Sequence, residues 1–482
     1  MITARGHIRS EEFSPEPERY ELRPRLALVT RRELFRTVGC GLAVLCLIPE
    51  ACAQEIGGTR RRGPAGSLPQ DIGAWLLVGA NGAVTGYTGK VEVGQNARTS
   101  LTQVIAEELR VPVASVTMVM GDTELTPFDM GTFGSRTTPT MVPQLRRAAA
   151  AARESLLDMA AAMLHCDRST LRAENGTVRT SSGQSVTYGE LTAGKRLTKT
   201  ISADVTLRPP AEWQVEGHPV PKVNGREIVT GAHRYASDIR RTGMLFGRVV
   251  RPSAFEAKLV SVDDSAATKM PGVTVVKEGD FVAVTAPDQF TAALAAAAVS
   301  AKWQAPEQIS VHELYDYLRS HPSQERGGFG GGGGRPQGDI SAALSSADVK
   351  LNETYTIAYI AHCPLEPRAA VAEWQGDNLT VWTGTQRPFG VRGELAAAFN
   401  IPESQVHVIM PDTGSGYGGK HTGECAVEAA RMAKSTGKPV KLVWTREEEF
   451  TWAYFRPAGV IEVASGASRN GALAAWEFHN YN

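Results

Sequence analysis

A glycine loop closed by a lysine, Gly414–Lys420 (GSGYGGK), is the stretch of this sequence with the clearest chemical meaning. Consecutive glycines expose backbone N–H groups, and a concave run of such groups binds anions, most obviously phosphate. The loop follows a strand-like run and precedes a helical pattern, as a nucleotide-binding P-loop does. His421, however, stands where a P-loop carries the Ser or Thr that coordinates magnesium. A P-loop-type nucleotide-binding protein is therefore kept only as an alternative.

The same design occurs twice in the chain. Residues 94–136, here called the first arm, and residues 384–420, the second arm, each begin with a glutamine in a turn and end in a glycine loop with a basic residue. Two such arms predict one large ligand held from two sides. Gln95 and Gln386 agree within one residue. The first-arm residues that recur in the second arm at one fixed offset are Pro112 (Pro402), Val116 (Val406), Met120 (Met410), Asp122 (Asp412) and Thr123 (Thr413).

Regular elements must position these loops. Apolar residues recur near a 3.6-residue period from Leu101 to Leu109 and predict a helix, which Pro112 ends. Val116–Met120 is strand-like, and Trp75–Val93 alternates around an Asn-Gly turn, so we expect a hairpin there. Each arm is therefore predicted to contain a turn, a helix, a strand and a glycine loop, in this order.

The rest of the chain divides into further units. Val142–Leu164 and Thr291–Ala301 are Ala-rich and predict helices. Gly327–Gly338 is glycine-rich and predicts a flexible linker. The expected organisation is a leader over residues 1–54, an N-terminal ligand-binding segment over 68–212, a compact α+β unit over 213–310, a linker over 311–345 and a second ligand-binding segment over 346–482.

Composition excludes several function classes. Lys plus Arg and Asp plus Glu both number 51, so the formal net charge of zero gives no support for nucleic acid as a partner. No uncharged apolar run reaches the length of a membrane span. Outside the expected leader the cysteines are Cys166, Cys363 and Cys425, too scattered for a disulfide framework, a zinc site, an iron–sulfur cluster or a haem attachment site.

The N-terminal residues have the order of an export signal. Thr30–Arg36 is a twin-arginine pattern, Thr37–Pro49 is uncharged, and Ala51–Ala53 supplies small residues for cleavage. The segment before Thr30 is long for a signal, so the true start codon is either Met1 or one downstream of it, and the sequence leaves both alternatives open. The expectation is a periplasmic protein that is exported already folded, and a basic amphipathic helix of a cytoplasmic protein is the alternative.

Several motifs in order resemble one family. Residues 215–252 resemble the a/b hammerhead domain of the xanthine dehydrogenase/aldehyde oxidase family. His362–Pro367, Gly384–Phe389, Gly416–Lys420 and Trp444–Glu448 resemble its molybdopterin-binding domain. A molybdopterin-type segment ahead of the hammerhead, with a twin-arginine leader, is similar to the group that contains the beta chains of isoquinoline 1-oxidoreductase. The fold implied is α+β, with a hammerhead domain flanked by two related α+β molybdopterin-binding segments.

The resemblance implies a molybdopterin dinucleotide in its cytosine form, with molybdenum held through the pterin dithiolene and not by protein side chains. It implies hydroxylation of an aldehyde or an N-heterocycle with water as the oxygen source. Gln386 corresponds to the glutamine beside the metal and is the expected catalytic residue. The residues expected to contact the cofactor are Gly94, Gln95, Gly134, Ser135, Arg136, Gln386, Gly416, Tyr417, Gly418 and Gly419.

Other polar residues receive plainer interpretations. His362 is expected to be packed or hydrogen-bonded and not a metal ligand. Glu424 and Glu447–Glu449 are expected to be surface or helix charges and not catalytic bases. Tyr417 replaces the family's commoner Phe.

Two features that the resemblance implies, the catalytic glutamate and the iron–sulfur ligands, have no counterpart in this sequence. The family's catalytic glutamate lies far toward the C-terminus, and we expect it beyond Asn482, in a chain that is a fragment or a split gene product. Iron–sulfur ligands are also absent from the sequence, so the resemblance implies a separate small subunit with two [2Fe-2S] clusters, and a cytochrome is a candidate acceptor beyond it. A non-catalytic cofactor-binding remnant is the alternative from another functional class.

Overall fold

The computed structural model describes residues 42–43, 71–192, 199–202, 204–322 and 337–482. The predicted leader, apart from residues 42–43, lies outside these residues, as do residues 323–336 of the predicted linker. Mixed helices and strands confirm the α+β class, whereas the hammerhead assignment and the domain boundaries stay predictions. Among the described residues, no helix is both long and apolar enough to cross a bilayer.

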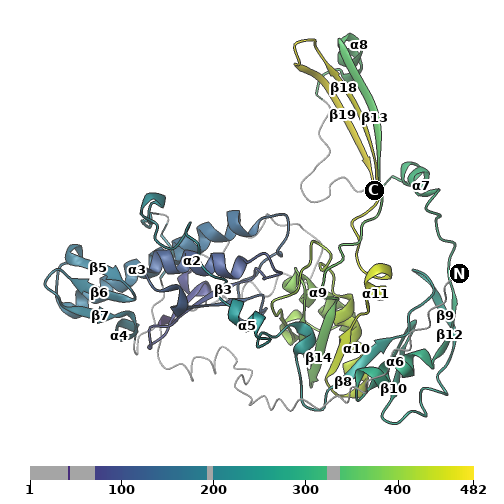
Figure 1. Ribbon diagram of the computed structural model, residues 1–482, viewed down its shortest axis with the longest axis horizontal. Helices are drawn as coiled ribbons and strands as arrows, with labels where there is room; N and C mark the ends of the chain where they lie inside the picture. The colour runs from purple at the N-terminus through teal and green to yellow at the C-terminus, as the bar shows by residue number, and fades with distance from the viewer. Residues whose placement is uncertain (1–41, 44–70, 193–198, 203, 323–336) are drawn as a thin grey trace, which may run out of the picture.

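The first unit is built around the first arm. Its four-stranded sheet has the order β1-β2-β3-β4, and α2 and the long α3 pack on each other and on its core. A small separate sheet, β5-β6-β7, lies at the far end of this unit (Figure 1). The bounds are β1 Leu42–Ala43, β2 Leu76–Val78, β3 Val84–Thr88, α2 Ala97–Leu109, β4 Val116–Met120, α3 Thr137–Leu164, β5 Leu171–Glu174, β6 Thr177–Thr180, β7 Ser185–Thr187 and α4 Tyr188–Thr192.

A seven-stranded sheet carries the second arm. Its order is β10-β11-β8-β17-β14-β15-β16, so one continuous sheet crosses the predicted boundaries at residues 310 and 346. The bounds are α5 Gly225–Val229, β8 Leu245–Val249, β9 Lys258–Asp263, β10 Thr274–Glu278, β11 Phe281–Ala286, α6 Gln289–Ala297, β12 Ser300–Gln304, β14 Ala369–Gln375, β15 Asn378–Thr383, α9 Pro388–Phe399, β16 Val406–Ile409, α10 Glu424–Thr436 and β17 Val440–Val443.

A third sheet projects from the body of the molecule (Figure 1). It has the order β13-β18-β19, with every neighbour antiparallel. The bounds are α7 Leu314–Ser320, α8 Ile340–Ser346, β13 Val349–Ile357, α11 Arg446–Thr451, β18 Gly459–Ala467 and β19 Leu473–Tyr481.

The duplication read from the sequence is present in the structure. Each arm belongs to an antiparallel hairpin followed by a helix and a parallel third strand, β2-β3-α2-β4 and β14-β15-α9-β16. The matched residues Arg110 and Asn400 both end their helix in the left-handed conformation, with φ of 56° and 51°. Both are followed by a proline-capped 3-10 turn that leads into the strand. The predicted hairpin, helix and strand of the first arm are therefore confirmed.

Two predicted helices have different ends. The helix expected to reach Ala301 stops at Ala297, because Ser300–Gln304 instead pairs with β9 as the strand β12. The helix expected from Val142 begins at Thr137 and contains Pro143 in its first turns. Pro143 is the seventh residue of α3, so the hydrogen bond that residue 143 would donate to Pro139 O is missing, and the helix continues through the proline.

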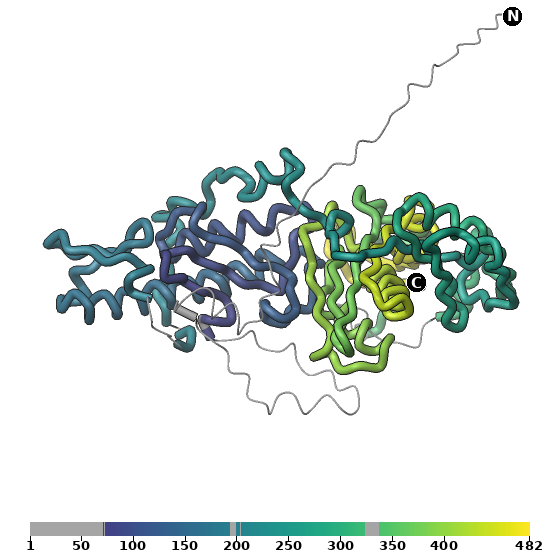
Figure 2. Tube along the Cα trace, turned by 90° about the horizontal axis from the view of Figure 1, so that it is seen from below, coloured from purple at the N-terminus to yellow at the C-terminus, as the bar shows by residue number. Residues whose placement is uncertain are grey.

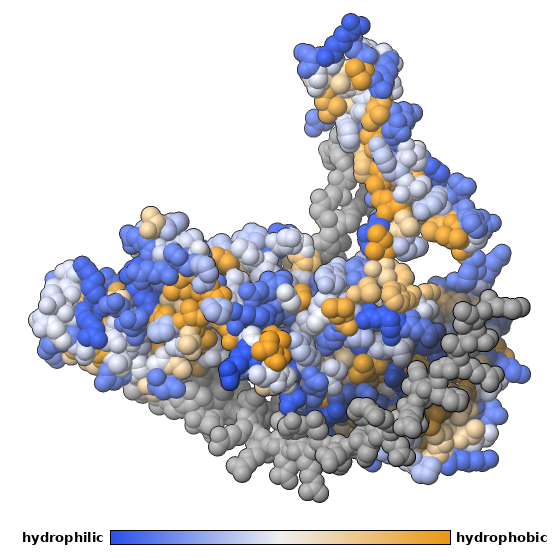
Figure 3. Space-filling view, viewed as in Figure 1, coloured by the Kyte–Doolittle hydropathy of each residue, from blue (hydrophilic) through white to orange (hydrophobic). Residues whose placement is uncertain are grey.

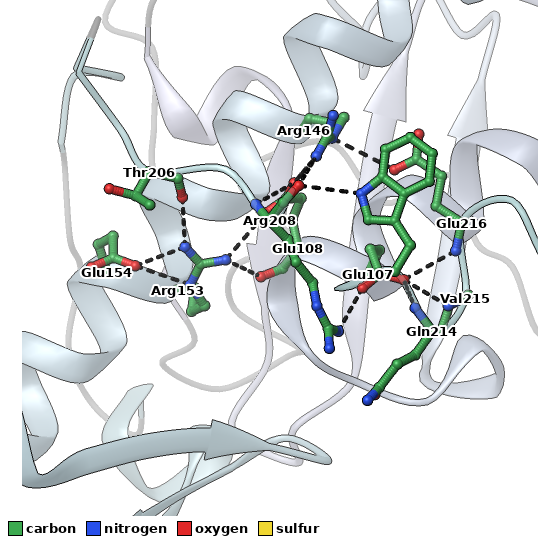
Figure 4. Close-up of polar contacts among 11 residues, drawn as sticks. Glu107, Glu108, Arg146, Arg153, Glu154, Thr206, Arg208, Gln214, Val215 and Glu216 are labelled. Atoms are coloured by element: carbon green, nitrogen blue, oxygen red, sulfur yellow. Dashed lines mark hydrogen bonds and ion pairs between the residues drawn. The ribbon is translucent and has the colours of Figure 1, made fainter. Parts of the chain in front are cut away.

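Buried charges attach the connector after the first unit to α2 (Figure 4). Glu107 Oε2 accepts backbone N–H bonds from Gln214, Val215 and Glu216 at 2.9, 2.6 and 3.0 Å. Burial alone would raise the pKa of Glu107, but these three donors and Arg208 outweigh it and lower that pKa. The connector therefore leaves the first unit along a fixed path.

Candidate functional site

The first unit and the sheet that carries the second arm lie side by side (Figure 2), and the two arms meet just where β4 and β16 end. Asp122 and Ile409 form an isolated antiparallel bridge between them. Thr123 N donates to Val408 O at 3.0 Å, and Met410 N donates to Gly121 O at 3.2 Å. The second loop follows this junction at Gly414, and the first-arm loop follows it at Gly134 after a longer connection. Thr132 and Phe133, at the end of that connection, contact Gln386 and His421, so the fold brings both loops to one place.

Gln386 ties the second arm to the first. Its side chain is 4% exposed. Nε2 donates to Thr132 O at 2.9 Å, while Oε1 accepts from Gly418 N at 2.9 Å and from Lys420 N at 3.4 Å. The Gln386 backbone carbonyl also accepts from Thr132 N at 2.8 Å. Gln386 therefore holds both glycine loops with one amide, and its role toward a metal stays a prediction.

The duplicated aspartates also join the arms, in different ways. Asp412 Oδ2 accepts from Arg98 Nε at 3.1 Å and from Asn224 Nδ2 at 2.8 Å, and its other oxygen pairs with the same guanidinium. Asp122 Oδ1 lies 2.8 Å from His407 Nε2. Each aspartate thus reaches across to the other arm, and Asp412 additionally holds the connector.

Both predicted loops contain residues in the left-handed region. Gly134 and Ser135 have φ of 62° and 55° in the first arm, and Tyr417 and Gly418 have φ of 54° and 91° in the second. Non-glycine residues rarely adopt this conformation, and it is concentrated at functional sites. Tyr417 is also 69% exposed, so its ring projects from the loop instead of packing.

Buried polar atoms without a hydrogen-bond partner gather around the second loop. Of the thirteen such side-chain atoms in the described part of the chain, seven belong to the segments 362–368 and 420–424. Native proteins rarely leave buried polar atoms without a hydrogen bond, so the group as a whole points to further polar partners. Within the chain, Arg368 Nε lies 4.0 Å from Glu424 Oε2, and Lys420 Nζ lies 3.5 Å from Glu366 Oε2. The seven atoms are His362 Nδ1, Glu366 Oε1, Arg368 Nε, Lys420 Nζ, His421 Nε2, Thr422 Oγ1 and Glu424 Oε2.

Lys420 is the most deeply buried charge of this group. It is 1% exposed, and its Nζ lies 3.5 Å from Glu366 Oε2, an ion-pair distance too long for a good hydrogen bond. Burial lowers the pKa of Lys420. Glu366 Oε2 already accepts from Gly414 N at 2.6 Å. Because the ammonium faces this carboxylate, the geometry does not favour the P-loop alternative, in which the lysine would be directed at phosphate.

Imidazole rings line the same region. His421 packs on Phe133 of the first arm with ring centroids 5.1 Å apart, and Tyr454 stacks on His362 at 5.9 Å. Burial, and after it nearby guanidinium groups, lowers the pKa of both histidines. His362 is thus packed in an aromatic group, as expected. Among the described residues, no group of His, Cys, Asp and Glu has the arrangement of a metal site.

The first-arm residues predicted to contact a ligand are more exposed than those of the second arm. Gln95 bonds within its own segment, accepting from Val93 N at 2.6 Å and donating to Val91 O at 2.9 Å. Gly94 and Arg136 are exposed as well. The structure therefore brings Gln386 together with Gly416, Gly418 and Gly419, whereas the exposed Tyr417 projects from this group and Gln95 is not part of it.

The expectation that Glu447–Glu449 are surface or helix charges agrees with their place on α11, although two of them are buried. Glu448 and Glu449 are on the helix α11 but are buried, not at the surface. Glu449 accepts from Arg368 Nη1 at 2.7 Å, and Glu448 accepts from Arg251 Nε at 2.7 Å. Consecutive glutamates look solvent-exposed in a sequence, because their arginine partners lie far away along the chain.

The sequence reasoning missed Thr132, Arg368 and Asp412 as parts of the site. Arg368 is 3% exposed and its guanidinium contacts Gly419 O as well as Glu449. Asp412 was found as a duplicated residue, and that duplication is the signal that could have assigned it a role. Thr132 contributes only its backbone, which no side-chain pattern reveals.

Comparison with known families agrees with this arrangement of two related arms. Two models, both described as a molybdopterin cofactor-binding domain, match residues 22–235 and 331–482. One therefore contains the first arm and the other the second. The class defined by fold and site is a two-armed molybdopterin-binding protein.

Curated relatives give the family. The chain is 31% identical over 85% of its length to a nicotinate dehydrogenase chain of Pseudomonas putida and 27% identical over 80% to the beta chain of isoquinoline 1-oxidoreductase of Brevundimonas diminuta. It is 26% identical over 95% to a Gluconacetobacter polyoxogenes protein called membrane-bound aldehyde dehydrogenase [pyrroloquinoline-quinone]. The chain belongs to the xanthine dehydrogenase/aldehyde oxidase family of molybdopterin-binding subunits, and the resemblance read from its motifs is confirmed. It spans 35%, 55% and 60% of the lengths of these three relatives.

Proposed function

We propose that this chain binds a molybdopterin dinucleotide between its two arms and acts as the large subunit, or a part of it, of a molybdenum hydroxylase. The observation that carries the proposal is the group of seven buried polar atoms without a hydrogen bond beside the Gly414–Lys420 loop. Such a group fits a polar ligand that offers both donors and acceptors. A pterin with a phosphate-bearing tail is a ligand of this kind.

The residues of the second arm would hold the pterin end. Gly416 has no room for a side chain, because a Cβ there would lie 2.6 Å from Gln386 Oε1. Gly419 is equally restricted by His362, at 2.8 Å. These two glycines let the loop backbone pack closely on Gln386 and His362. The side of the loop that faces away from them would then contact the ligand. Gly134, Ser135 and Arg136 would hold the nucleotide end, for which we propose the cytosine form.

The proposed reaction is the hydroxylation of an aldehyde or of an electron-poor carbon of an N-heterocycle. A C–H bond is replaced by C–OH, water supplies the oxygen, and two electrons and two protons are released. Two relatives carry the names of N-heterocycle enzymes and one that of an aldehyde dehydrogenase, which supports this substrate class. The molybdenum cofactor supplies the two-electron redox chemistry, and the electrons pass to a separate [2Fe-2S] subunit. The general base is not assigned to any residue of this chain.

The metal and pterin content of the purified full chain tests the cofactor proposal. We expect about one molybdenum and one pterin dinucleotide per chain when the protein is produced with its cofactor-loading machinery. Lys420→Met should keep the fold, because it removes a buried, poorly paired ammonium, but it should lower molybdenum occupancy. Bound pyrroloquinoline quinone in place of pterin, or a stoichiometric nucleoside triphosphate, would contradict the proposal.

Turnover separates the enzyme from the non-catalytic alternative. With the iron–sulfur subunit present, the loaded protein should reduce an artificial dye in the presence of an aldehyde or N-heterocycle. Full cofactor occupancy without any dye reduction across both substrate classes would favour a cofactor-binding remnant.

We further propose export by the twin-arginine route, on the sequence of Thr30–Arg36. Replacing Arg31 and Arg32 together by Lys should keep the protein in the cytoplasm. Cell fractionation checks this, and unchanged periplasmic recovery of the double variant would exclude that route.

A further inference from the structure

A pocket of about 530 Å³ lies where three segments that are distant in the sequence meet, and none of its lining residues belongs to the two glycine loops. The end of β8 with the residues after it, the helix α6 and the helix α11 form its walls. This volume is within the range of pockets that bind small molecules. The pocket differs from the hydrophobic strip along the projecting sheet, which Figure 3 shows, because charged and apolar groups line it together.

Two neighbouring glutamates of α11 distinguish this pocket from the candidate site. Glu448 lines the pocket, whereas Glu449 accepts from Arg368 Nη1 at 2.7 Å, beside the Gly414–Lys420 loop. The helix α11 therefore contributes to both places with different residues, and the pocket is a separate feature of the fold.

Ion pairs and hydrogen bonds fix the walls of the pocket. Arg251, just after β8, donates from Nε to Glu448 Oε1 at 2.7 Å and from Nη2 to Glu428 Oε2 at 3.1 Å. Glu448 Oε2 accepts from Thr445 N at 2.7 Å and completes the capping box of α11. The Arg251 guanidinium also lies over the Trp444 ring, 4.6 Å from its centroid. Because Arg251 and Glu448 neutralise each other, the pocket is formed in advance and its free charges come from other residues.

Two charged groups of the pocket are not neutralised in this way. Arg248 donates from Nη1 to Val443 O at 3.0 Å and lies 3.9 Å from Glu448 Oε2, beyond hydrogen-bond reach. Its Nε and Nη2 form no hydrogen bond with the described residues. Glu447 is exposed and forms no ion pair within the described part of the chain. One guanidinium and one carboxylate are therefore available to a ligand.

Much of the remaining wall is apolar. Trp452 contributes its indole ring, which packs on Phe255 with ring centroids 4.7 Å apart. Ala293 and Ala296 present only methyl groups from α6, so the helix leaves space beside the ring. An aromatic or branched aliphatic group of a ligand fits against such a surface.

We propose that this pocket binds a free α-amino acid with an apolar side chain. The carboxylate of the amino acid pairs with Arg248, its ammonium pairs with Glu447, and its side chain packs on Trp452. A zwitterion matches one free charge of each sign, whereas a simple anion would face the like charges of α11 without compensation. The proposal adds a binding site to the chain and does not depend on cofactor binding or turnover.

Calorimetric titration of the full chain with L-phenylalanine tests the proposal. The amino acid should bind at one site per chain. Two analogues each lack one of its charges: N-acetyl-L-phenylalanine has no ammonium, and L-phenylalaninamide has no carboxylate. Each should bind about tenfold more weakly, because a hydrogen bond between charged groups is lost.

Variants that remove one charge assign the two contacts. Glu447→Gln should weaken the binding of L-phenylalanine about tenfold but leave that of N-acetyl-L-phenylalanine unchanged, because the derivative has no ammonium to pair. Arg248→Met should weaken the binding of L-phenylalanine and leave that of L-phenylalaninamide unchanged, for the corresponding reason.

Two variants of α6 locate the site. Ala293 and Ala297 are both exposed on this helix, and only Ala293 lines the pocket. Ala293→Phe should fill the pocket and abolish binding, whereas Ala297→Phe should leave the affinity within about twofold. Both changes are at the surface, so both variants should fold, which circular dichroism checks.

Three outcomes would overturn the proposal. The first is no binding of L-phenylalanine to the unmodified chain. The second is an equal loss of binding in Ala293→Phe and Ala297→Phe. The third is binding of N-acetyl-L-phenylalanine as tight as that of L-phenylalanine, because the pocket would then take a simple carboxylate and not a zwitterion.

Discussion

The first and second arms share a chain path but differ in what surrounds their loops. Both have the hairpin, helix, capped turn and parallel strand, with matching left-handed residues at Arg110 and Asn400. The second arm is part of a seven-stranded sheet, and its loop is enclosed by Gln386, His362 and Arg368. The first-arm loop is more exposed. Duplication thus preserved the scaffold, while the two copies diverged into an enclosed binding side and an open one.

Removing Asp412 should give the largest difference between the arms. Asp412→Ala leaves Arg98 without its carboxylate and frees the connector at Asn224. Breaking a buried ion pair costs about 3–5 kcal/mol, and the lower end applies because Arg98 is partly exposed. The equivalent Asp122→Ala loses His407 and two local turn contacts and should cost about half as much. Denaturant unfolding of both variants checks the order, and equal losses would show that the arms are coupled symmetrically.

The two glutamines give the next test. Gln386→Met leaves Thr132 O and Gly418 N without their partner in a buried place, and it should lower the free energy of unfolding by about 2–3 kcal/mol. Gln95→Met affects an exposed side chain that bonds its own segment, so it should stay within about 0.5 kcal/mol. If Gln386 also acts beside the metal, a Gln386→Glu variant that retains molybdenum should still lose turnover. If Gln386→Met and Gln95→Met lowered the free energy of unfolding by the same amount, the predicted difference between the two arms would be wrong.

The sequence was sufficient for the features that repeat and insufficient for those that depend on long-range contacts. Pro112 and Pro402 mark the ends of equivalent helices, and the strands Val116–Met120 and Val406–Ile409 follow at the same spacing. Ser300 and Ala301, the first two residues of β12, were assigned to the preceding helix, because the alanine run before them favours helix and only the pairing of β12 with β9 overrides it. The burial of Glu449 depends on Arg368, which lies far along the chain, and no local pattern encodes such a pair.

Glycine variants test whether both loops hold the ligand. Gly418→Val and Gly134→Val each force a branched side chain into the left-handed region, which costs about 1–2 kcal/mol. Gly437→Val ends α10 at a similar φ of 63°, away from the loops, and is the matched control for this strain. All three should lose similar stability, but only the first two should lose molybdenum, as measured by elemental analysis. If both loop variants kept a full complement of molybdenum, the two arms would share a fold, but they would not both hold the ligand.

The smallest expected effect is a pH dependence that originates in His362 and His421, which lie beside the loop of the second arm. Burial lowers the pKa of His362 and of His421, so below the ordinary histidine pKa of about 6.5 the unfolded chain binds protons that the folded chain does not. The stability these rings contribute is fully present above that pH and is lost as the pH falls through the window down to the lowered pKa values. The first arm contains no histidine between residues 94 and 136. Replacing both histidines by Asn should flatten the fall in unfolding free energy between about pH 6.5 and 5, while the variant and the parent should show the same pH slope above about pH 7.5. An unchanged slope in the acidic range would show that the titrating groups are not His362 and His421, and the difference in environment between the two loops would then have no electrostatic consequence.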